Sequence, residues 1–160
     1  MTAFRSCSRG LTLIELVIAM AILAILAAAV LPLSEVTVTR TKELELRRAL
    51  REIRSALDDY KEDYDKAVEE KKIFATVGDS GYPAELVQLQ EGNDWGGMYP
   101  YNKKYLRRIP RDPFDKEDLG WGLRSYIDDV DSSGWGGEDV YDVYSQSEEI
   151  ALDGSYYRDW

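Results

Sequence analysis

The sequence predicts an α+β protein in which one long N-terminal helix packs on a small antiparallel β-sheet. An apolar run, LTLIELVIAMAILAILAAAVLPL, fills residues 11–33. After it, apolar side chains recur every three or four positions, which is the pattern of an amphipathic helix. Near the C-terminus, two short segments rich in Val and Tyr flank a Gly-rich stretch, as in a β-hairpin. We therefore expect a helix with a membrane half and an amphipathic half, the second of which covers the sheet.

The apolar run contains one acidic residue close to its start. Residues 16–33 hold 18 positions without a charge, which is long enough for a membrane helix. Glu15 precedes them, and a charge at membrane depth costs on the order of 2.5–3.5 kcal/mol. The small residues at 27–29 would suit a secretory signal, and a plain anchor needs only the length. Neither a secretory signal nor a plain membrane anchor gains anything from an acidic residue at position 15. Arg5 and Arg9 place the preceding leader on the cytoplasmic side.

The leader ends in a recognisable motif. Arg9-Gly10 followed by Leu-Thr-Leu-Ile-Glu-Leu resembles the processing signal of type IV pilins and type II secretion pseudopilins. In that family, prepilin peptidase cleaves after the glycine and methylates the new N-terminus. The resemblance implies cleavage after Gly10 and methylation of Leu11. The family usually has Phe at the first mature position, and Leu11 is likewise bulky and apolar.

The same resemblance assigns assembly roles to Glu15 and Pro32. After cleavage, Glu15 would neutralise the terminal amine of a neighbouring subunit as it enters a filament. Charge pairing in a low-dielectric setting offsets part of the burial cost and sets the stagger between subunits. Pro32 removes one helical hydrogen bond, which by itself means a kink. In the family, this region unwinds when subunits pack together.

The second half of the helix has one apolar face. Its residues follow spacings of 4, 3, 4, 3 and 4: Leu46, Leu50, Ile53, Leu57, Tyr60 and Tyr64. Charged residues such as Glu43, Arg47 and Lys61 are expected on the other sides. From residue 11 to about residue 62 the helix would run roughly 78 Å, at 1.5 Å per residue. Its first half must be covered by lipid or by other subunits, which is a physical argument for a polymer.

The remaining residues predict a small head. Residues 83–90 are expected to form a short second helix with Pro near its first turn, and 91–98 a loop. Residues 123–128 and 139–145 are expected to be the two strands. Tyr82-Pro83, then YLRRIPRDPF and VYDVYS, resemble in their order the G-type major pseudopilin of type II secretion systems. Residues 65–81 look like an insertion relative to that pattern.

Together, the two resemblances imply a type IV pilin-like fold and a structural role without catalysis. The expected parts are a removed leader (1–10), a transmembrane and polymerisation helix (11–33), an amphipathic half (34–72) and a periplasmic head with acidic loops (73–160). The implied product is a helical homopolymer, the pseudopilus. Its implied partners are minor pseudopilins, an inner-membrane assembly platform and prepilin peptidase.

Two alternatives stay open at this level. The first is a type IV pilus subunit for adhesion, motility or DNA uptake. The lack of paired C-terminal cysteines favours the pseudopilin, since many pilins close their last loop with a disulfide. The second is a plain anchored binding module, which would not be cleaved and methylated at Gly10.

Charge and composition exclude several functions. The net charge is −10, and residues 112–160 carry 14 acidic and 3 basic side chains against 15 of each in 34–111. Such an acidic part repels phosphate backbones, so no nucleic-acid partner is expected. The chain has no histidine, and its single Cys7 lies in the leader. No disulfide and no enzymatic activity are therefore expected.

Two acidic loops are candidate calcium sites. In the first, Asp129, Asp131 and Ser133 present oxygens at alternate positions before a glycine, as at the opening of a calcium loop. A full EF-hand would need Glu where Val140 stands, and a polar hairpin turn explains the same residues. The second loop spans 145–155, where resemblance to the major pseudopilins implies calcium. Its candidate ligands are Glu149, Asp153 and Ser155.

Overall fold

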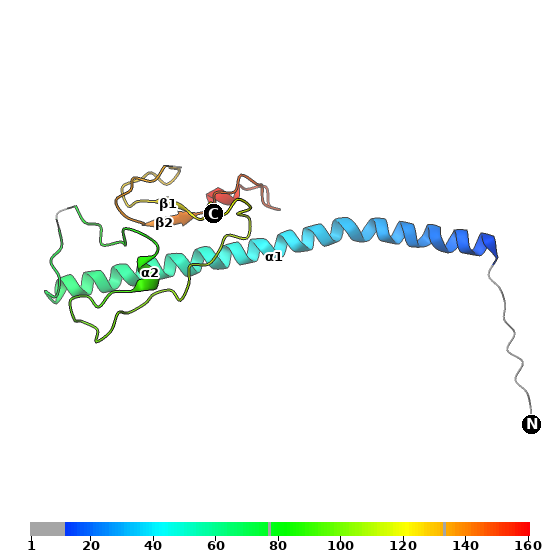
Figure 1. The fold of residues 1–160 in the computed structure, drawn as a ribbon. Coiled ribbons are helices and arrows are strands. Elements are labelled where there is room, and N and C mark those ends of the chain that lie inside the picture. Colours follow the sequence, from blue (N-terminus) through cyan, green and yellow to red (C-terminus); the bar gives the residue numbers. More distant parts are fainter. Residues whose placement is uncertain (1–11, 77, 133) are drawn as a thin grey trace, which may run out of the picture. The chain divides into compact units, whose positions relative to one another are not determined.

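The computed structural model describes residues 12–76, 78–132 and 134–160. Within the first range, it describes the backbone but not the side chains of residues 29–33. Its elements, shown in Figure 1, are the helices α1 (Leu13–Glu69) and α2 (Gln88–Glu91), the strands β1 (Gly122–Arg124) and β2 (Asp142–Tyr144), and the 3₁₀ helix η1 (Tyr157–Asp159). The long helix packed on a two-stranded antiparallel sheet confirms the α+β, type IV pilin-like fold. The chain divides into two compact units, Met1–Thr39 and Arg40–Trp160, which we describe separately.

The core of the second unit is built on one face of α1. The predicted stripe is buried from Leu46, which is fully inaccessible, to Tyr60, which is 8% exposed, and Tyr64 at its end is partly buried. From the other side, Leu89, Val140 and other apolar residues join the same cluster. Each fully buried Leu or Ile contributes about 1.5–3 kcal/mol. The spacing of three and four therefore identified the face that holds the head together.

Glu43 departs from the expectation that it lies on a solvated side of the helix. It is 6% exposed. Its Oε1 accepts the backbone N–H of Leu152 at 2.8 Å and the hydroxyl of Tyr157 at 3.3 Å. Glu43 stands three residues before Leu46, so it extends the buried face by one turn. The acid is buried because the C-terminal loop supplies two donors for it.

The sheet is shorter than the sequence predicts. β1 pairs with β2 in antiparallel fashion, with Leu123 opposite Val143. The expected strand 123–128 ends at residue 124 because the next two N–H groups donate to carboxylates. The N–H of Ser125 donates to Asp128 at 2.7 Å, and that of Tyr126 donates to Asp139 at 2.8 Å. Side-chain acceptors thus replace the inter-strand ladder.

The second helix is also shorter and begins later than expected. The predicted helix spans residues 83–90, but the observed helix α2 begins only at Gln88 and ends at Glu91. The carbonyl of Pro83 accepts the N–H of Val140 at 2.7 Å, so it is not available to a helical turn. The N–H of Ala84 donates to the side chain of Gln88 at 2.9 Å. Packing against the strand region therefore displaces the start of the helix.

The segment YLRRIPRDPF has a structural role. The N–H groups of Tyr105 and Leu106 both donate to the carbonyl of Leu89, at 2.9 Å each. Asp112, which is buried, accepts the N–H of Phe114 at 2.8 Å and the hydroxyl of Ser145 at 2.5 Å. These bonds tie the segment to α2 and to the end of β2.

A buried carboxylate fastens the next part of the head to α1. Asp63 is 1% exposed. It accepts hydrogen bonds from the hydroxyls of Tyr105 at 2.6 Å and Tyr99 at 3.0 Å, and Lys103 Nζ lies 2.5 Å away. Burial alone would raise the pKa of Asp63, but the hydrogen bonds from Lys103 and the two tyrosines hold it below its usual value.

We predict that Asp63→Asn lowers the free energy of unfolding by about 1–3 kcal/mol at pH 7, because the amide NH₂ group that replaces one carboxylate oxygen cannot accept that oxygen's hydrogen bonds and the charge opposite Lys103 is lost. The control is Glu62→Gln, which removes an exposed acid beside it and should change stability by less than about 0.5 kcal/mol. Chemical denaturation of both variants measures the difference.

The same network makes a prediction for pH. The folded-state pKa of Asp63 is lowered, so its stabilisation is present above the unfolded value of about 3.9 and is lost as the pH falls through the folded value. The stability difference between wild type and Asp63→Asn should therefore shrink below about pH 4. A difference that stays constant from pH 7 to pH 3 would contradict the assigned ionisation.

Candidate functional site

The first turn of α1 carries the candidate assembly residue. The N–H of Glu15 donates to Thr12 Oγ1 at 3.3 Å, and the N–H of Thr12 donates to Glu15 Oε2 at 3.5 Å. This reciprocal arrangement of Thr and Glu three residues apart is a capping box, which explains why the helix begins at Leu13. A bond of 3.5 Å is weak, so the exposed carboxylate remains available to a stronger, positively charged donor.

The surface that follows Glu15 is apolar on all sides. Large side chains between residues 13 and 26 are each at least 50% exposed: Leu13, Ile14, Leu16, Val17, Ile18, Met20, Ile22, Leu23, Ile25 and Leu26. A helix that is apolar all round needs cover from lipid or from other chains. Glu15 therefore stands at the start of a surface that is incomplete by itself.

Some predicted residues fall outside the part of the chain that is described. Gly10, Leu11 and Ser133 are among them, and so are the side chains of residues 29–33 at the end of the expected span. Pro32 lies within the backbone of α1. In the described residues, no helix combines the length and apolarity needed to cross a membrane.

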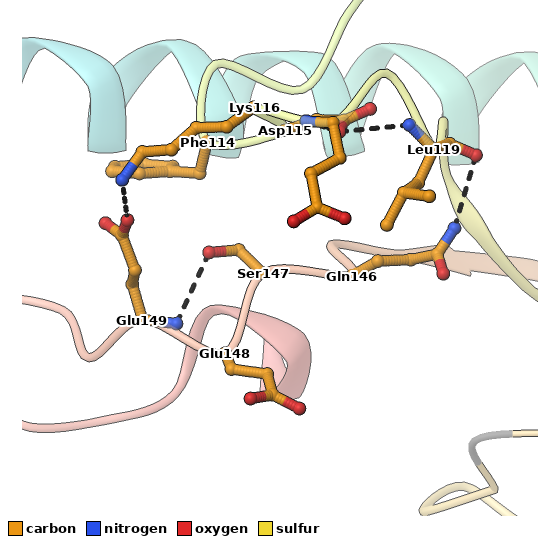
Figure 2. A pocket seen from close by; sticks show the side chains of 9 residues that line it. Phe114, Asp115, Lys116, Leu119, Gln146, Ser147, Glu148 and Glu149 are labelled. Carbon is orange, nitrogen blue, oxygen red and sulfur yellow. Dashed lines mark hydrogen bonds and ion pairs between the residues drawn. The ribbon is translucent and has the colours of Figure 1, made fainter.

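Glu149, one of the candidate calcium residues of the last loop, lines a cavity of about 540 Å³, which is drawn in Figure 2. It opens between residues 114–119 and 146–149. Glu149 forms an ion pair with Lys116 across it. On the other side of the opening, the carbonyl of Leu119 accepts a hydrogen bond from Gln146 at 3.4 Å. Basic and neutral groups of the chain itself thus hold the two loops together.

Asp153 and Ser155 pair with each other. Asp153 Oδ1 accepts the N–H of Ser155 at 3.0 Å and its hydroxyl at 2.6 Å, and Asp153 Oδ2 lies 3.6 Å from Arg47. The Ser155 hydroxyl also accepts the indole N–H of Trp160 at 2.7 Å. The structure therefore brings together two of the three residues proposed for this loop, while Glu149 has a different partner.

In the described part of the chain, no three acidic side chains gather in a way that could hold a metal ion. Asp129 and Asp131 are exposed in the first loop. Glu149 is paired with Lys116, so calcium binding at Glu149 would compete with this ion pair. Calcium in either loop stays a prediction from the sequence.

Several aspartates of the acidic part shape its loops by accepting backbone N–H groups. They include Asp112, Asp115, Asp128, Asp139 and Asp153. The N–H of Gly120, followed by that of Leu119, lowers the pKa of Asp115 against the opposing effect of desolvation. The N–H groups of Ser125 and Gly136 lower the pKa of Asp128. Much of the acidic surplus therefore has a structural use.

Sequence reasoning missed the arginines that fasten the C-terminus to α1. Arg54 donates to Asp142 at 2.7 Å, to the carbonyl of Val143 at 3.1 Å and to that of Trp160 at 2.7 Å. The guanidinium of Arg47 lies 4.0 Å from the centroid of the Trp160 ring. Glu43, Arg47, Leu50 and Arg54 follow spacings of 4, 3 and 4. The three charged residues of this row lie beside the apolar stripe at Leu50. Their spacing was the signal in the sequence that could have predicted contacts with the head.

With this geometry in view, the comparisons with known proteins concern the N-terminus. Residues 5–31 match the family model of the prokaryotic N-terminal methylation motif. This motif is the signature of type IV pilin-like and pseudopilin substrates of prepilin peptidase. The motif supports a type IV pilin-like subunit, and it implies processing by prepilin peptidase and pilus-like assembly. No curated protein and no solved structure matches the chain.

We predict that protein isolated from membranes begins at Leu11 and carries one added methyl group on its terminal amine. Intact-mass and N-terminal peptide analysis measures both features. Gly10→Leu should block cleavage, whereas Gly134→Leu, at an open position in a loop, should leave processing unchanged. A chain that begins after the alanines at 27–29 would instead identify a secretory signal.

For calcium, the sequence predicts that the melting temperature of the detergent-solubilised chain is several degrees higher in millimolar calcium than in chelator. A ligand at 100 times its Kd stabilises by about 2.7 kcal/mol. Asp153→Asn should abolish the rise, and Glu52→Gln, on an exposed part of α1, should preserve it. Equal melting temperatures in the two conditions would refute the calcium site.

Proposed function

We propose that the chain is a structural pseudopilin, which polymerises after processing into a periplasmic pseudopilus that drives type II protein secretion. The observation that carries the proposal is the methylation motif placed on an apolar helix whose first turn holds Glu15. Prepilin peptidase, minor pseudopilins and an inner-membrane assembly platform are the proposed partners. Before assembly, the apolar helix would anchor the subunit in the inner membrane with its head in the periplasm.

The exposed apolar residues support polymerisation as the mechanism. Side chains from Leu13 to Leu26 can exchange contact with lipid for contact with the same segment of neighbouring subunits. The exchange needs no refolding of the head, because the buried face of α1 from Leu46 to Tyr60 belongs to the other unit. The free energy of assembly would come from apolar burial.

Glu15 would give this assembly its register. In the isolated chain its carboxylate has only a weak bond to Thr12. A neighbouring terminal amine is charged, so the new bond would be shorter and stronger. An unpaired carboxylate among apolar helices is costly, which disfavours subunits packed in any other stagger. Glu15 would thus act by penalising wrong arrangements as much as by stabilising the right one.

The way in which the last loop of the head is held in place favours a pseudopilin over a pilus subunit. Beyond the leader the sequence has no cysteine. Its last loop is fastened to α1 by Glu43, Arg47 and Arg54 in place of a disulfide. The methylation motif is common to both kinds of subunit, so a cellular experiment has to separate them.

The proposed function predicts that deletion of the gene leaves exoproteins in the periplasm. Wild type should restore their release to the medium, and Glu15→Ala should restore less than about a tenth of it, since one lost buried ion pair exceeds 1.4 kcal/mol. The matched control is Glu35→Ala, which removes an exposed acid from the same helix and should restore release fully.

The experiment also has two contrary outcomes. Normal secretion together with loss of surface filaments would identify a type IV pilus subunit. Full rescue by Glu15→Ala would refute the role of the carboxylate in assembly. Immunoblots must show equal amounts of the Glu15→Ala and Glu35→Ala proteins in membranes, so that failed rescue reports assembly.

A further inference from the structure

The head contains a second cavity. Its volume is about 380 Å³, near the lower end of the range for ligand sites, about 300–1,000 Å³. Four aromatic residues and several acidic ones line it. We call it the aromatic pocket, and its principal residues are Tyr60, Tyr64, Tyr82, Trp95, Asp79 and Glu138.

The rings of the aromatic pocket are set at steep angles to one another. Trp95 lies 4.8 Å from Tyr60 at 68°, and 5.9 Å from Tyr64 at 82°, measured between ring centroids and planes. These rings pack edge to face against one another, and all three line the pocket. The packing holds the aromatic lining of the pocket in place.

Trp95 is held in this position at a conformational cost. Its φ is 53°, in the left-handed region that a non-glycine residue seldom occupies. The side chain of Asn93 accepts its backbone N–H at 2.9 Å, and Tyr105 accepts its indole N–H at 2.7 Å. The polar edge of the indole is therefore already satisfied. Backbone strain at a buried aromatic residue beside a cavity is typical of functional sites.

The outer wall comes from the segment that looked like an insertion in the sequence. Asp79 accepts the hydroxyl of Tyr64 at 3.0 Å and the N–H of Gly81 at 3.0 Å. Gly81 has a φ of 81°, and a Cβ there would lie 2.6 Å from the Tyr64 ring. Only glycine allows this close approach. This wall of the pocket thus depends on Asp79 and on the glycine at position 81, both of which lie in that segment.

The pocket is acidic. Among the described residues that line it, Asp79, Glu138 and Asp139 are negatively charged and none is basic. Burial, and then the hydrogen bond and charge of Asp79, raise the pKa of Tyr64 to about 12. Aromatic faces and carboxylates both attract cations, and both disfavour anions.

From this combination we propose that the aromatic pocket binds an organic cation, an alkylammonium group supplied by a free small molecule or by a lysine side chain of another polypeptide. A quaternary or primary ammonium fits the volume. The rings cover its alkyl groups, and the carboxylates neutralise its charge. This inference is independent of filament assembly, because every residue of the pocket belongs to the second unit.

The test is a titration of the full processed chain in detergent, with ¹⁵N-labelled tryptophan, followed by the indole resonances. Choline chloride should shift the Trp95 resonance saturably and leave that of Trp121 unchanged. The neutral isostere 3,3-dimethyl-1-butanol should bind roughly tenfold more weakly, because it lacks the charge. Equal binding of the two compounds, or no saturable shift, would overturn the proposal.

Exposed acids supply matched variants that leave the fold intact. Glu138→Gln removes a charge from the rim and should weaken choline binding roughly threefold to tenfold. Glu148→Gln removes an equally exposed charge outside the pocket and should have no effect. If the two variants behave alike, the attraction comes from net charge and the pocket is not a site.

Two further probes distinguish the sources of the cation. Butylammonium represents the free group, and a short peptide with one lysine represents a polypeptide. Tighter binding of the peptide would support a protein partner, and equal binding would support a small molecule. An alanine-for-lysine version of the peptide should not bind. Binding of that version would contradict recognition of the ammonium group.

Discussion

The head depends on the docking of its loops onto one face of α1. Its sheet consists of two strands of three residues, and most of the remaining chain has no repetitive structure. Such loops cannot form a core among themselves. Leu46, Ile53 and Leu57 supply the apolar surface on which they gather, and hydrophobic burial provides the main stabilisation. Any change that tilts or shortens this part of the helix would release loops that are close only because of it.

Polar side chains at the edges of that face decide which loop docks where. Glu43 receives the loop around Leu152, and Asp63 receives the loop that carries Tyr99 and Tyr105. Buried carboxylates are costly without donors, so each one tolerates only the loop that brings the matching groups. The aspartates of the acidic part work in the same way on a local scale. Hydrogen bonds to carboxylates thus take the place that a larger sheet has in other α+β proteins.

The helix α1 therefore has two apolar surfaces, one buried and one exposed. Most of its apolar residues from Leu46 to Ala67 are buried in the head, whereas Leu44 and the large apolar residues between 13 and 26 are exposed. A subunit with this division can lose or gain neighbours along its first segment while its head stays folded. The methylation motif lies on that first segment. In the proposed function, processing there would create the charged terminus that Glu15 meets. The aromatic pocket belongs to the other unit and gives the head a recognition chemistry of its own.

Sequence alone determined the features that depend on neighbours in the chain. Helical periodicity identified the buried face of α1, and a ten-residue leader with Glu15 identified the processing signal that the family match confirms. Only the tertiary structure decided the partners of Glu43 and Arg54, the end of β1 at Arg124, and the pairing of Lys116 with Glu149. Apart from the local bond between Ser125 and Asp128, these contacts join residues between 13 and 114 positions apart. A local pattern shows which face is apolar, but it does not show which distant donor a buried carboxylate will meet, because that depends on how the loops pack.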